Sequence, residues 1–198
     1  MSKTFLKNAN FREANLEHAI LRNAYLEETN MSMADMSYAD LNCADIFTTN
    51  FDNSDLSYAN LSGCNIDDTS FDNAYLLSIN LSDAKITETS FERTNIRNSN
   101  LLRVNFDDVC MECTDFSKSN MQYANFNDTD IISSRFENTD LSNANLSRTS
   151  LDYSNFKDAN LQGANLSFST TCDTDFRGAI LTDANLENVN IDDANLEE

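Results

Sequence analysis

Large apolar residues recur at every fifth position along almost the entire chain. From Leu6 to Leu196 this frame holds 39 positions, here called centres, and all of them are Leu, Ile, Met or Phe except Thr171. Two residues before the centre, 35 of the 39 residues are Ala, Ser, Thr or Cys. One residue before it, 27 of 39 are Asn or Asp, and the two residues that follow it are mostly polar.

A period of five fits neither a straight helix nor a straight strand. A helix turns about 100° per residue, so every fifth residue would move around its surface. A strand alternates faces, so every fifth residue would point in and out by turns. A chain that bends a corner every five residues keeps the centres together. The centre and the small residue two before it then point inward, the Asn or Asp between them points outward, and the two polar residues form the corner.

The sequence also indicates how many corners close one coil. Stacked coils place like residues on like. When Met1 is counted as a further centre, identity between centres rises from 9 of 39 pairs at a separation of 5 residues to 18 of 36 pairs at 20 residues. The ladders at this spacing are Phe51–Phe71–Phe91, Phe116–Phe136–Phe156–Phe176, Ile46–Ile66–Ile86 and Leu21–Leu41–Leu61–Leu81–Leu101. The pattern predicts an all-β fold, a quadrilateral β-helix with 20 residues per coil. Residues 1–198 form a single domain of about ten coils, ~48 Å long, with right-handed winding.

The repeat resembles the pentapeptide-repeat family, whose pattern is Ala, Asp or Asn, Leu and two variable residues. Literal matches are Ala14-Asn15-Leu16, Ala39-Asp40-Leu41, Ala59-Asn60-Leu61, Ala144-Asn145-Leu146, Ala184-Asn185-Leu186 and Ala194-Asn195-Leu196. The resemblance covers essentially the whole chain and implies a right-handed quadrilateral β-helix. Members of the family with known function look like mimics of duplex DNA that bind type II topoisomerases such as gyrase and confer quinolone resistance. This chain lacks the loops that interrupt the repeat in some of those members, and it stops in frame at Leu196-Glu197-Glu198 without a terminal helix.

The charge is strongly negative and unevenly distributed. The net charge is −20, which disfavours binding to nucleic acid or to an anionic membrane and suits a basic partner. The sides of the predicted square whose centres begin at Leu6, Phe11, Leu16 and Leu21 carry −7, −8, −4 and −1, which sum to −20. Two adjacent sides therefore carry most of the charge.

Acidic residues on these two sides form columns at the 20-residue step. The first column contains Asp52, Asp72, Glu92, Glu112, Asp152 and Asp192, and the second contains Glu28, Asp68, Glu88, Asp108 and Asp128. Stacked like charges ~5 Å apart repel one another, and this cost suggests a use for them. These eleven residues are the candidate interaction surface. A duplex ~48 Å long carries ~28 phosphate charges, so DNA mimicry is plausible, and a merely solvating acidic surface is the alternative.

The residues offer little chemistry for catalysis. His18 is the only histidine and falls on an outward position, and Cys110-x-x-Cys113 has no second pair with which to hold zinc. We expect no enzyme activity, no catalytic residues, no cofactor and no bound metal. The five cysteines do not suggest a disulfide framework, and no apolar run has the length of a transmembrane helix or signal peptide. We expect a cytoplasmic protein with no membrane association.

Two functions remain open. The first is a non-enzymatic interaction or scaffold protein with an unassigned protein partner. The second is a DNA mimic that binds gyrase or another basic DNA-binding protein and modulates quinolone action. Because solenoid ends expose unpaired backbone, we also predict an end-to-end homodimer, through the first coil with Phe5, Ile20 and Tyr25 or through the acidic Glu197-Glu198 end. Residues 168–172 break the centre rule and predict a bulge or a weakened coil.

Overall fold

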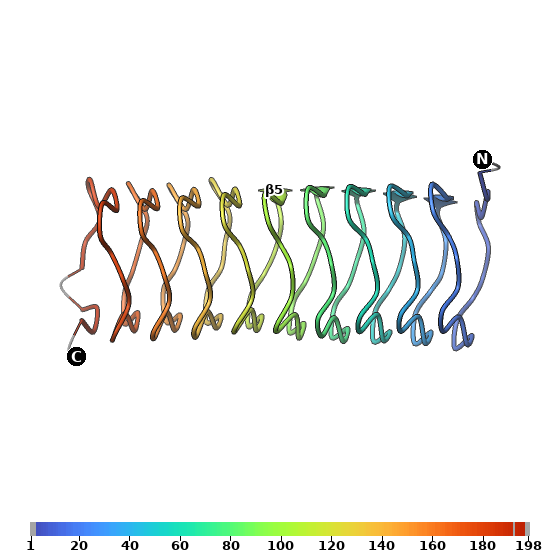
Figure 1. Cartoon of the computed structure of the whole chain (residues 1–198), viewed down its shortest axis with the longest axis horizontal. Helices are drawn as coiled ribbons and strands as arrows, with labels where there is room; N and C mark the ends of the chain where they lie inside the picture. The colour runs from blue at the N-terminus through green and yellow to red at the C-terminus, as the bar shows by residue number, and fades with distance from the viewer. Residues whose placement is uncertain (1–2, 192, 197–198) are drawn as a thin grey trace.

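The chain winds into a rod of stacked, four-sided coils (Figure 1). A computed structural model describes residues 3–191 and 193–196. The predicted site residue Asp192 and the acidic pair Glu197-Glu198 lie outside the described residues. One side of the rod carries five short parallel strands, β1 (Tyr25–Glu27), β2 (Asp45–Phe47), β3 (Asn65–Asp67), β4 (Lys85–Thr87) and β5 (Asn105–Asp107), arranged in sequence order in one sheet.

The register of the coils is constant at 20 residues. Ile46 of β2 pairs with Ile66 of β3, which pairs with Ile86 of β4. The other sides are joined by isolated parallel bridges with the same step, for example Asn60 to Asn80 and Asn80 to Asn100. The predicted 20-residue coil is therefore confirmed.

Backbone hydrogen bonds join each coil to the next in a fixed pattern. The N–H of the centre Leu16 donates to the carbonyl oxygen of Asp35 (2.7 Å), and the N–H of Asp35 donates back to Ala14 (3.0 Å). At the corner, the N–H of His18 donates to the carbonyl oxygen of Ser37 (3.0 Å). A pentapeptide in an inner coil makes bonds to both neighbouring coils, as Asp35 does to Ala14 and Met36 does to Asp55, and a single coil has nothing to pair with on its own.

The Asn or Asp before each centre has a structural role that its outward position did not reveal. The side-chain oxygen of Asn15 accepts the N–H of Glu17 (3.0 Å), which is the first corner residue. The N–H of Ala19 closes the same corner on the carbonyl oxygen of Leu16 (2.9 Å). A short side chain with an acceptor oxygen three bonds from Cα is suited to this bond, and this explains why Asn and Asp dominate the position.

The second corner residue adopts a left-handed backbone conformation throughout the rod. Among the residues that the structure describes, thirty-four non-glycine residues have φ between 45° and 63°, including bulky ones such as Tyr58 and Phe168. We expected Ser, Asn, Asp and Gly at the corners, but Arg, Lys, Glu and Tyr occur there as well. The inter-coil bonds hold these residues in a conformation that costs an isolated non-glycine residue about 1–2 kcal/mol.

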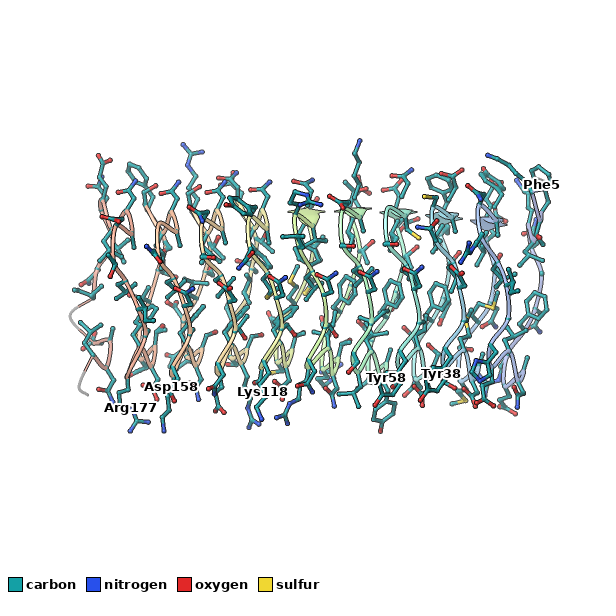
Figure 2. The ribbon with its side chains drawn as sticks, in the orientation of Figure 1. Phe5, Tyr38, Tyr58, Lys118, Asp158 and Arg177 are labelled. Atoms are coloured by element: carbon teal, nitrogen blue, oxygen red, sulfur yellow. The ribbon has the colours of Figure 1, made fainter. Side chains whose placement is uncertain are left out.

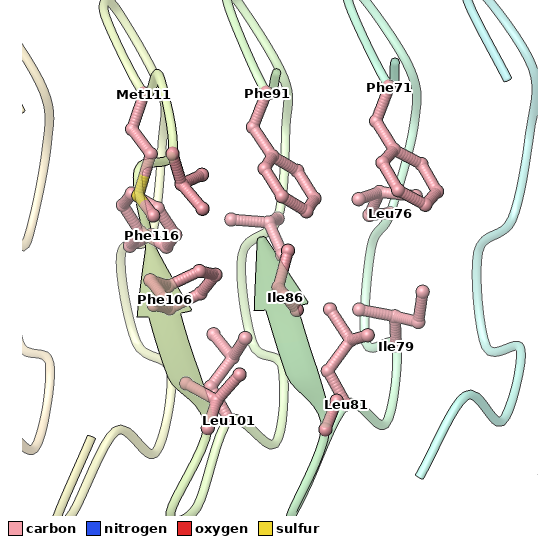
Figure 3. Packing of buried hydrophobic residues seen from close by; sticks show 14 of the residues in the cluster. Phe71, Leu76, Ile79, Leu81, Ile86, Phe91, Leu101, Phe106, Met111 and Phe116 are labelled. Atoms are coloured by element: carbon pink, nitrogen blue, oxygen red, sulfur yellow. The ribbon is translucent and has the colours of Figure 1, made fainter. Parts of the chain in front are cut away.

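The core is a set of ladders in which each centre stacks on the centre 20 residues away. The rings of Phe51 and Phe71 stack at 4.8 Å with a 4° interplanar angle, and those of Phe71 and Phe91 at 4.9 Å and 6° (Figure 3). All three side chains are buried. Offset stacking of buried rings contributes about 0.5–1.5 kcal/mol beyond the burial of their area, so the predicted Phe ladders stabilise the rod directly.

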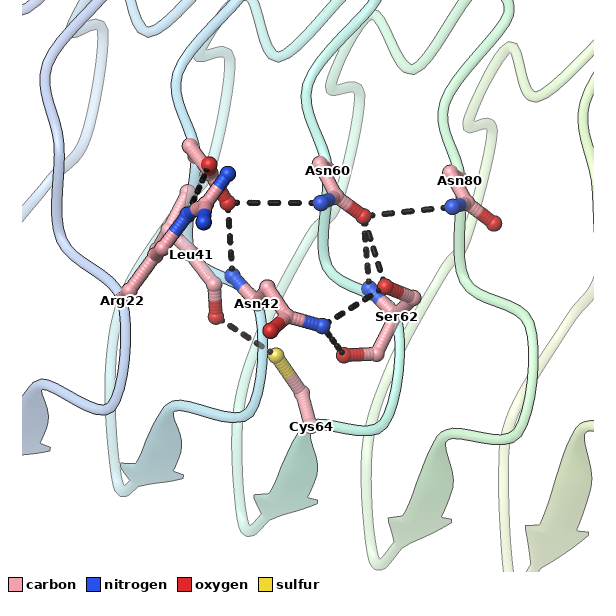
Figure 4. Close-up of polar contacts among 8 residues, drawn as sticks. Arg22, Leu41, Asn42, Asn60, Ser62, Cys64 and Asn80 are labelled. Carbon is pink, nitrogen blue, oxygen red and sulfur yellow. Dashed lines mark hydrogen bonds and ion pairs between the residues drawn. The ribbon is translucent and has the colours of Figure 1, made fainter.

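Outward-facing amides form further ladders along the rod (Figure 4). The Asn60 amide donates to a carboxylate oxygen of Asp40 (3.3 Å), Asn80 donates to Asn60 (3.2 Å), and Asn100 donates to Asn80 (3.1 Å). The acceptor oxygens also take backbone N–H groups, as Asn60 does from Ser62 (3.2 Å). These amides are therefore engaged in the scaffold.

The predicted irregularity at residues 168–172 is not a bulge. Thr170 keeps its bridges to Ser150 and Asn190, and Thr171 is buried at a centre position. Its hydroxyl donates to the carbonyl oxygen of Asn190 (2.6 Å). A polar centre fits because its hydroxyl finds a backbone acceptor in the next coil. The prediction of a bulge was therefore wrong, and that of a weakened coil stays a prediction.

The first coil exposes apolar residues, as its sequence predicts. Phe5 is 71% exposed and Ile20 is 78% exposed, whereas Tyr25 is only half-buried because its ring lies between those of Phe5 and Phe47. Within the described ranges, no helix is long and apolar enough to cross a membrane.

Candidate functional site

The two predicted acidic columns border one face of the rod. Asp68 of the second column and Asp72 of the first are separated by residues 69–71, which form one side of a coil. The next two coils repeat the arrangement with Glu88 and Glu92 and with Asp108 and Glu112, and the coils are ~4.8 Å apart. We call this side, with the equivalent residues of other coils, the acidic face. The structure places the two columns at its two corners.

The first acidic residue of the first column is held by backbone and hydroxyl donors. A carboxylate oxygen of Asp52 accepts the N–H of Asp72 (3.2 Å) and the hydroxyl of Ser70. Asn would normally precede the centre and cap this corner, but Ser70 stands there. Its oxygen is 3.5 Å from the Asp72 nitrogen, too far for a strong bond. Asp52, one coil earlier, supplies the missing acceptor.

The same substitution recurs along the first column. Asp72 accepts the N–H of Glu92 (3.0 Å) and the hydroxyl of Ser90. Asp152 accepts the N–H of Cys172 (2.8 Å). The carboxylates of Asp52, Asp72 and Asp152 are thus scaffold acceptors, and hydrogen bonds of a carboxylate to backbone N–H groups are among the stronger ones.

The second column projects further from the scaffold. Its five residues, Glu28, Asp68, Glu88, Asp108 and Asp128, are all exposed. Asp68 accepts the hydroxyl of Thr48 (3.2 Å), and Asp128 accepts the amide of Asn127. Among the described residues, Glu88 and Asp108 have no hydrogen-bond or ion-pair partner. These carboxylates are available to bind something else.

An open pocket of about 400 Å³ lies on the acidic face, between the two columns, in the middle of the rod. Glu88, Asp108 and Asp128 line one corner, Glu112 lies at the other, and Asp130 stands on the face between them. The remaining lining residues are Thr89, Ser90, Val109 and Cys110. We call this pocket the acidic groove. Five carboxylates and no basic side chain line it, so its field attracts cations.

The thiol of Cys110, in the Cys110-x-x-Cys113 pair, is partly buried and hydrogen-bonded. The Cys110 thiol donates to a carboxylate oxygen of Glu92 (3.6 Å), and burial, together with that carboxylate, raises its pKa. Burial likewise raises the pKa of the Cys64 thiol to about 12. Thiols with raised pKa values are poor nucleophiles and poor metal ligands. Among the described residues, no group of three potential metal ligands comes together.

Sequence reasoning missed Asp130 as a site residue. It occupies the position before a centre, where Asp is ordinarily a corner acceptor, so it did not belong to either column. The signal was its neighbourhood, because the 20-residue register places Asp130 beside Cys110 and therefore between the columns.

The side of the rod that follows the acidic face carries a different set of residues. His18, Tyr38 and Tyr58 stack along one corner, with ring centroids 5.0 and 4.9 Å apart, and Lys118 and Arg177 lie further along that side (Figure 2). Each tyrosine is 49% exposed. The rings cover one another's faces, so stacking stabilises this corner of the rod. The stack needs no binding function to explain it.

The sequence matches the family model described as Pentapeptide repeats in eight copies, over residues 9–46, 48–73, 64–101, 74–112, 99–138, 110–148, 133–167 and 159–198. No curated protein matches the chain significantly.

Solved structures show the same fold. HetL, a pentapeptide repeat protein involved in heterocyst differentiation regulation from the cyanobacterium Nostoc sp. strain PCC 7120, superimposes with a TM-score of 0.83 at 22% identity, over 96% of this chain and 86% of HetL. QnrB1, a plasmid-mediated fluoroquinolone resistance protein, superimposes with a TM-score of 0.51 at 16% identity, over 96% of this chain and 91% of QnrB1. The right-handed quadrilateral β-helix predicted from the sequence is confirmed.

Proposed function

The chain belongs to the pentapeptide-repeat family, and on that basis we propose that it is a non-enzymatic interaction protein whose acidic groove binds a basic segment of a protein partner. The observation that carries the proposal is the groove itself, in which Glu88 and Asp108 make no hydrogen bond or ion pair with any described residue. A carboxylate that already accepts a backbone N–H would gain less binding free energy from a basic partner than a carboxylate with no partner.

The groove favours Lys or Arg side chains presented at intervals. Carboxylates in adjacent coils are ~4.8 Å apart along the rod, and an extended peptide places side chains on one face about every 7 Å. Arg suits such a surface because its planar fork binds carboxylates in bidentate fashion. Exposed pairs contribute about 0.2–1 kcal/mol each, so several must act together, and binding falls as salt screens them.

Binding of an Arg-rich peptide tests this proposal. Fluorescence anisotropy with a labelled Arg-rich peptide would compare the natural protein with a variant that combines Glu88→Gln, Asp108→Asn and Asp128→Asn. At about 0.5 kcal/mol per lost pair, the variant should bind about tenfold more weakly.

A matched control removes three acidic residues outside the groove, by Asp158→Asn, Asp183→Asn and Glu187→Gln, all at exposed positions. The control variant should bind the peptide nearly as well as the natural protein. Equal weakening in both variants would show that net charge alone attracts the peptide, and this would remove the groove from the proposal.

DNA mimicry is the second candidate. It is favoured by the two columns of acidic residues that follow the rod at its corners, and the fold is shared with QnrB1, a fluoroquinolone resistance protein. Against it, Asp52, Asp72 and Asp152 accept scaffold bonds, which leaves free acidic residues mainly in the middle of the rod. Inhibition of gyrase supercoiling, or its protection from a quinolone, would support this candidate. No effect at micromolar protein in low salt would eliminate it.

A further inference from the structure

The core changes its packing in the middle of the rod. Phe51, Phe71 and Phe91 stack behind the acidic face, but the next centre in that ladder is Met111. The aromatic rings continue on neighbouring sides instead, from Phe106 to Phe126 and from Phe116 to Phe176. The exchange occurs at the edge-on contact of Phe91 with Phe106, at 6.1 Å and 87° (Figure 3).

The corner of the second acidic column changes at the same level. At most corners of the rod, the N–H of the residue after the corner donates to the carbonyl oxygen of the preceding centre, as Ala19 does to Leu16. In the described structure, this bond is missing at the corners that follow β1 to β5. Thr49, Thr69 and Thr89 instead donate their hydroxyls to nearby carbonyl groups, at 3.1, 3.0 and 2.7 Å. Val109 has no hydroxyl with which to do so. One coil later the corner is closed, because the N–H of Thr129 donates to Phe126 (3.2 Å).

Backbone bonds between coils are weakest at this level. The N–H of Met111 is 3.3 Å from the carbonyl oxygen of Asp130, against 2.7 and 2.8 Å for the equivalent bonds of Phe51 and Phe71. One bond that recurs in neighbouring coils, from the N–H of Asp108 to the carbonyl oxygen of Asn127, does not form between the described residues. The equivalent bond from Arg148 to Ser167 is 2.9 Å. The N–H of Asp130 does not reach the carbonyl oxygen of Val109 with good hydrogen-bond geometry, although Cys110 and Asp130 keep their parallel bridge.

The weak bonds coincide with a stack of acidic residues in which Glu88 and Asp108 have no partner among the described residues. Glu88, Asp108 and Asp128 occupy one corner in three successive coils. Like charges one coil apart repel and push the coils away from each other. This repulsion, the missing threonine hydroxyl and the interrupted Phe ladder all act on the same few residues.

We propose that residues 106–131 form a seam between two differently packed halves of the rod. Repulsion among the groove carboxylates keeps the inter-coil hydrogen bonds of the seam weak. Cations that neutralise these carboxylates strengthen those bonds. The seam opens locally more often than the coils on either side. A basic segment bound in the groove would stiffen the rod at this point, but the seam itself does not depend on the proposed function.

Hydrogen exchange measured by mass spectrometry tests the seam in the natural protein without any ligand. At low salt, amides of residues 106–131 should exchange about tenfold faster than those of residues 46–71, which occupy equivalent positions three coils earlier. Added NaCl should slow exchange in the seam and leave residues 46–71 almost unchanged, because salt screens the repulsion.

Two variants separate local repulsion from net charge. The combination Glu88→Gln, Asp108→Asn and Asp128→Asn should slow exchange in the seam severalfold, whereas the control Asp158→Asn, Asp183→Asn and Glu187→Gln should not. Equal exchange of the two segments, or no response of the seam to the groove variant, would overturn the proposal. Peptide binding does not enter this experiment, so its failure leaves the proposed function standing.

Discussion

Truncation of one ring in the Phe ladder gives the sharpest prediction about stability. Phe71 is buried to 1% exposure and its ring is stacked on both sides, against Phe51 and Phe91. Replacing a buried Phe with Ala costs about 3–5 kcal/mol through lost burial and the remaining cavity. Two stacking contacts are lost as well, each about 0.5–1.5 kcal/mol. Phe71→Ala should therefore destabilise the rod by about 4 kcal/mol or more.

Urea unfolding followed by circular dichroism would measure this loss, with two comparison variants. Phe71→Leu keeps most of the apolar volume and should cost about 1.5 kcal/mol. Phe168→Ala removes a ring that is 53% exposed and should change stability by less than about 0.5 kcal/mol. Similar losses for Phe71→Ala and Phe168→Ala would refute the assignment of the ladder as core.

Three further predictions concern the scaffold and its ends. Asn80→Ala removes a ladder amide and the acceptor for the N–H of Ser82 (3.2 Å), so urea unfolding should show a loss of about 1–3 kcal/mol; no change would contradict the ladder. The hydroxyl and N–H of Ser37 hold the pKa of Asp35 below its ordinary value, so the stability from Asp35 is present above the unfolded pKa and lost as pH falls through the folded one. Asp35→Asn should therefore flatten the acid dependence of the urea midpoint below about pH 4, and an unchanged acid limb would argue against the assignment. The exposed Phe5 and Ile20 support the predicted end-to-end dimer, which light scattering during size exclusion should detect; only monomer at high concentration would exclude it.

The fold could be predicted from the sequence because a five-residue period leaves one solution. The centre and the small residue before it must face inward together, and only a corner in every pentapeptide allows this. Identity at a spacing of 20 residues then fixed the coil, and the pairing of Ile46 with Ile66 confirms it. The conformation at Thr171 was harder to predict. Its buried hydroxyl donates to a backbone carbonyl oxygen, and the hydrophobic pattern of the sequence does not show such a contact.

The candidate site was predictable in outline but not in detail. The frame assigned the acidic residues to two corner columns, yet Asp72 and Glu112 belong to the same column and differ in what they do. Asp72 accepts a backbone N–H because Ser90, one coil later, cannot supply the acceptor that Asn would provide. Such a bond depends on distances between coils, and outward-facing charge alone does not show it.

The central claim is that the acidic residues divide into scaffold acceptors and a free binding surface. Asp72→Ala and Glu112→Ala test it most directly, because both residues occupy the first corner position of the same column. Urea unfolding at low salt should show a loss of about 1–3 kcal/mol for Asp72→Ala, which leaves the N–H of Glu92 unpaired. Glu112→Ala should be neutral or slightly stabilising, since it removes one carboxylate from the acidic groove. Equal losses for the two variants would contradict the division.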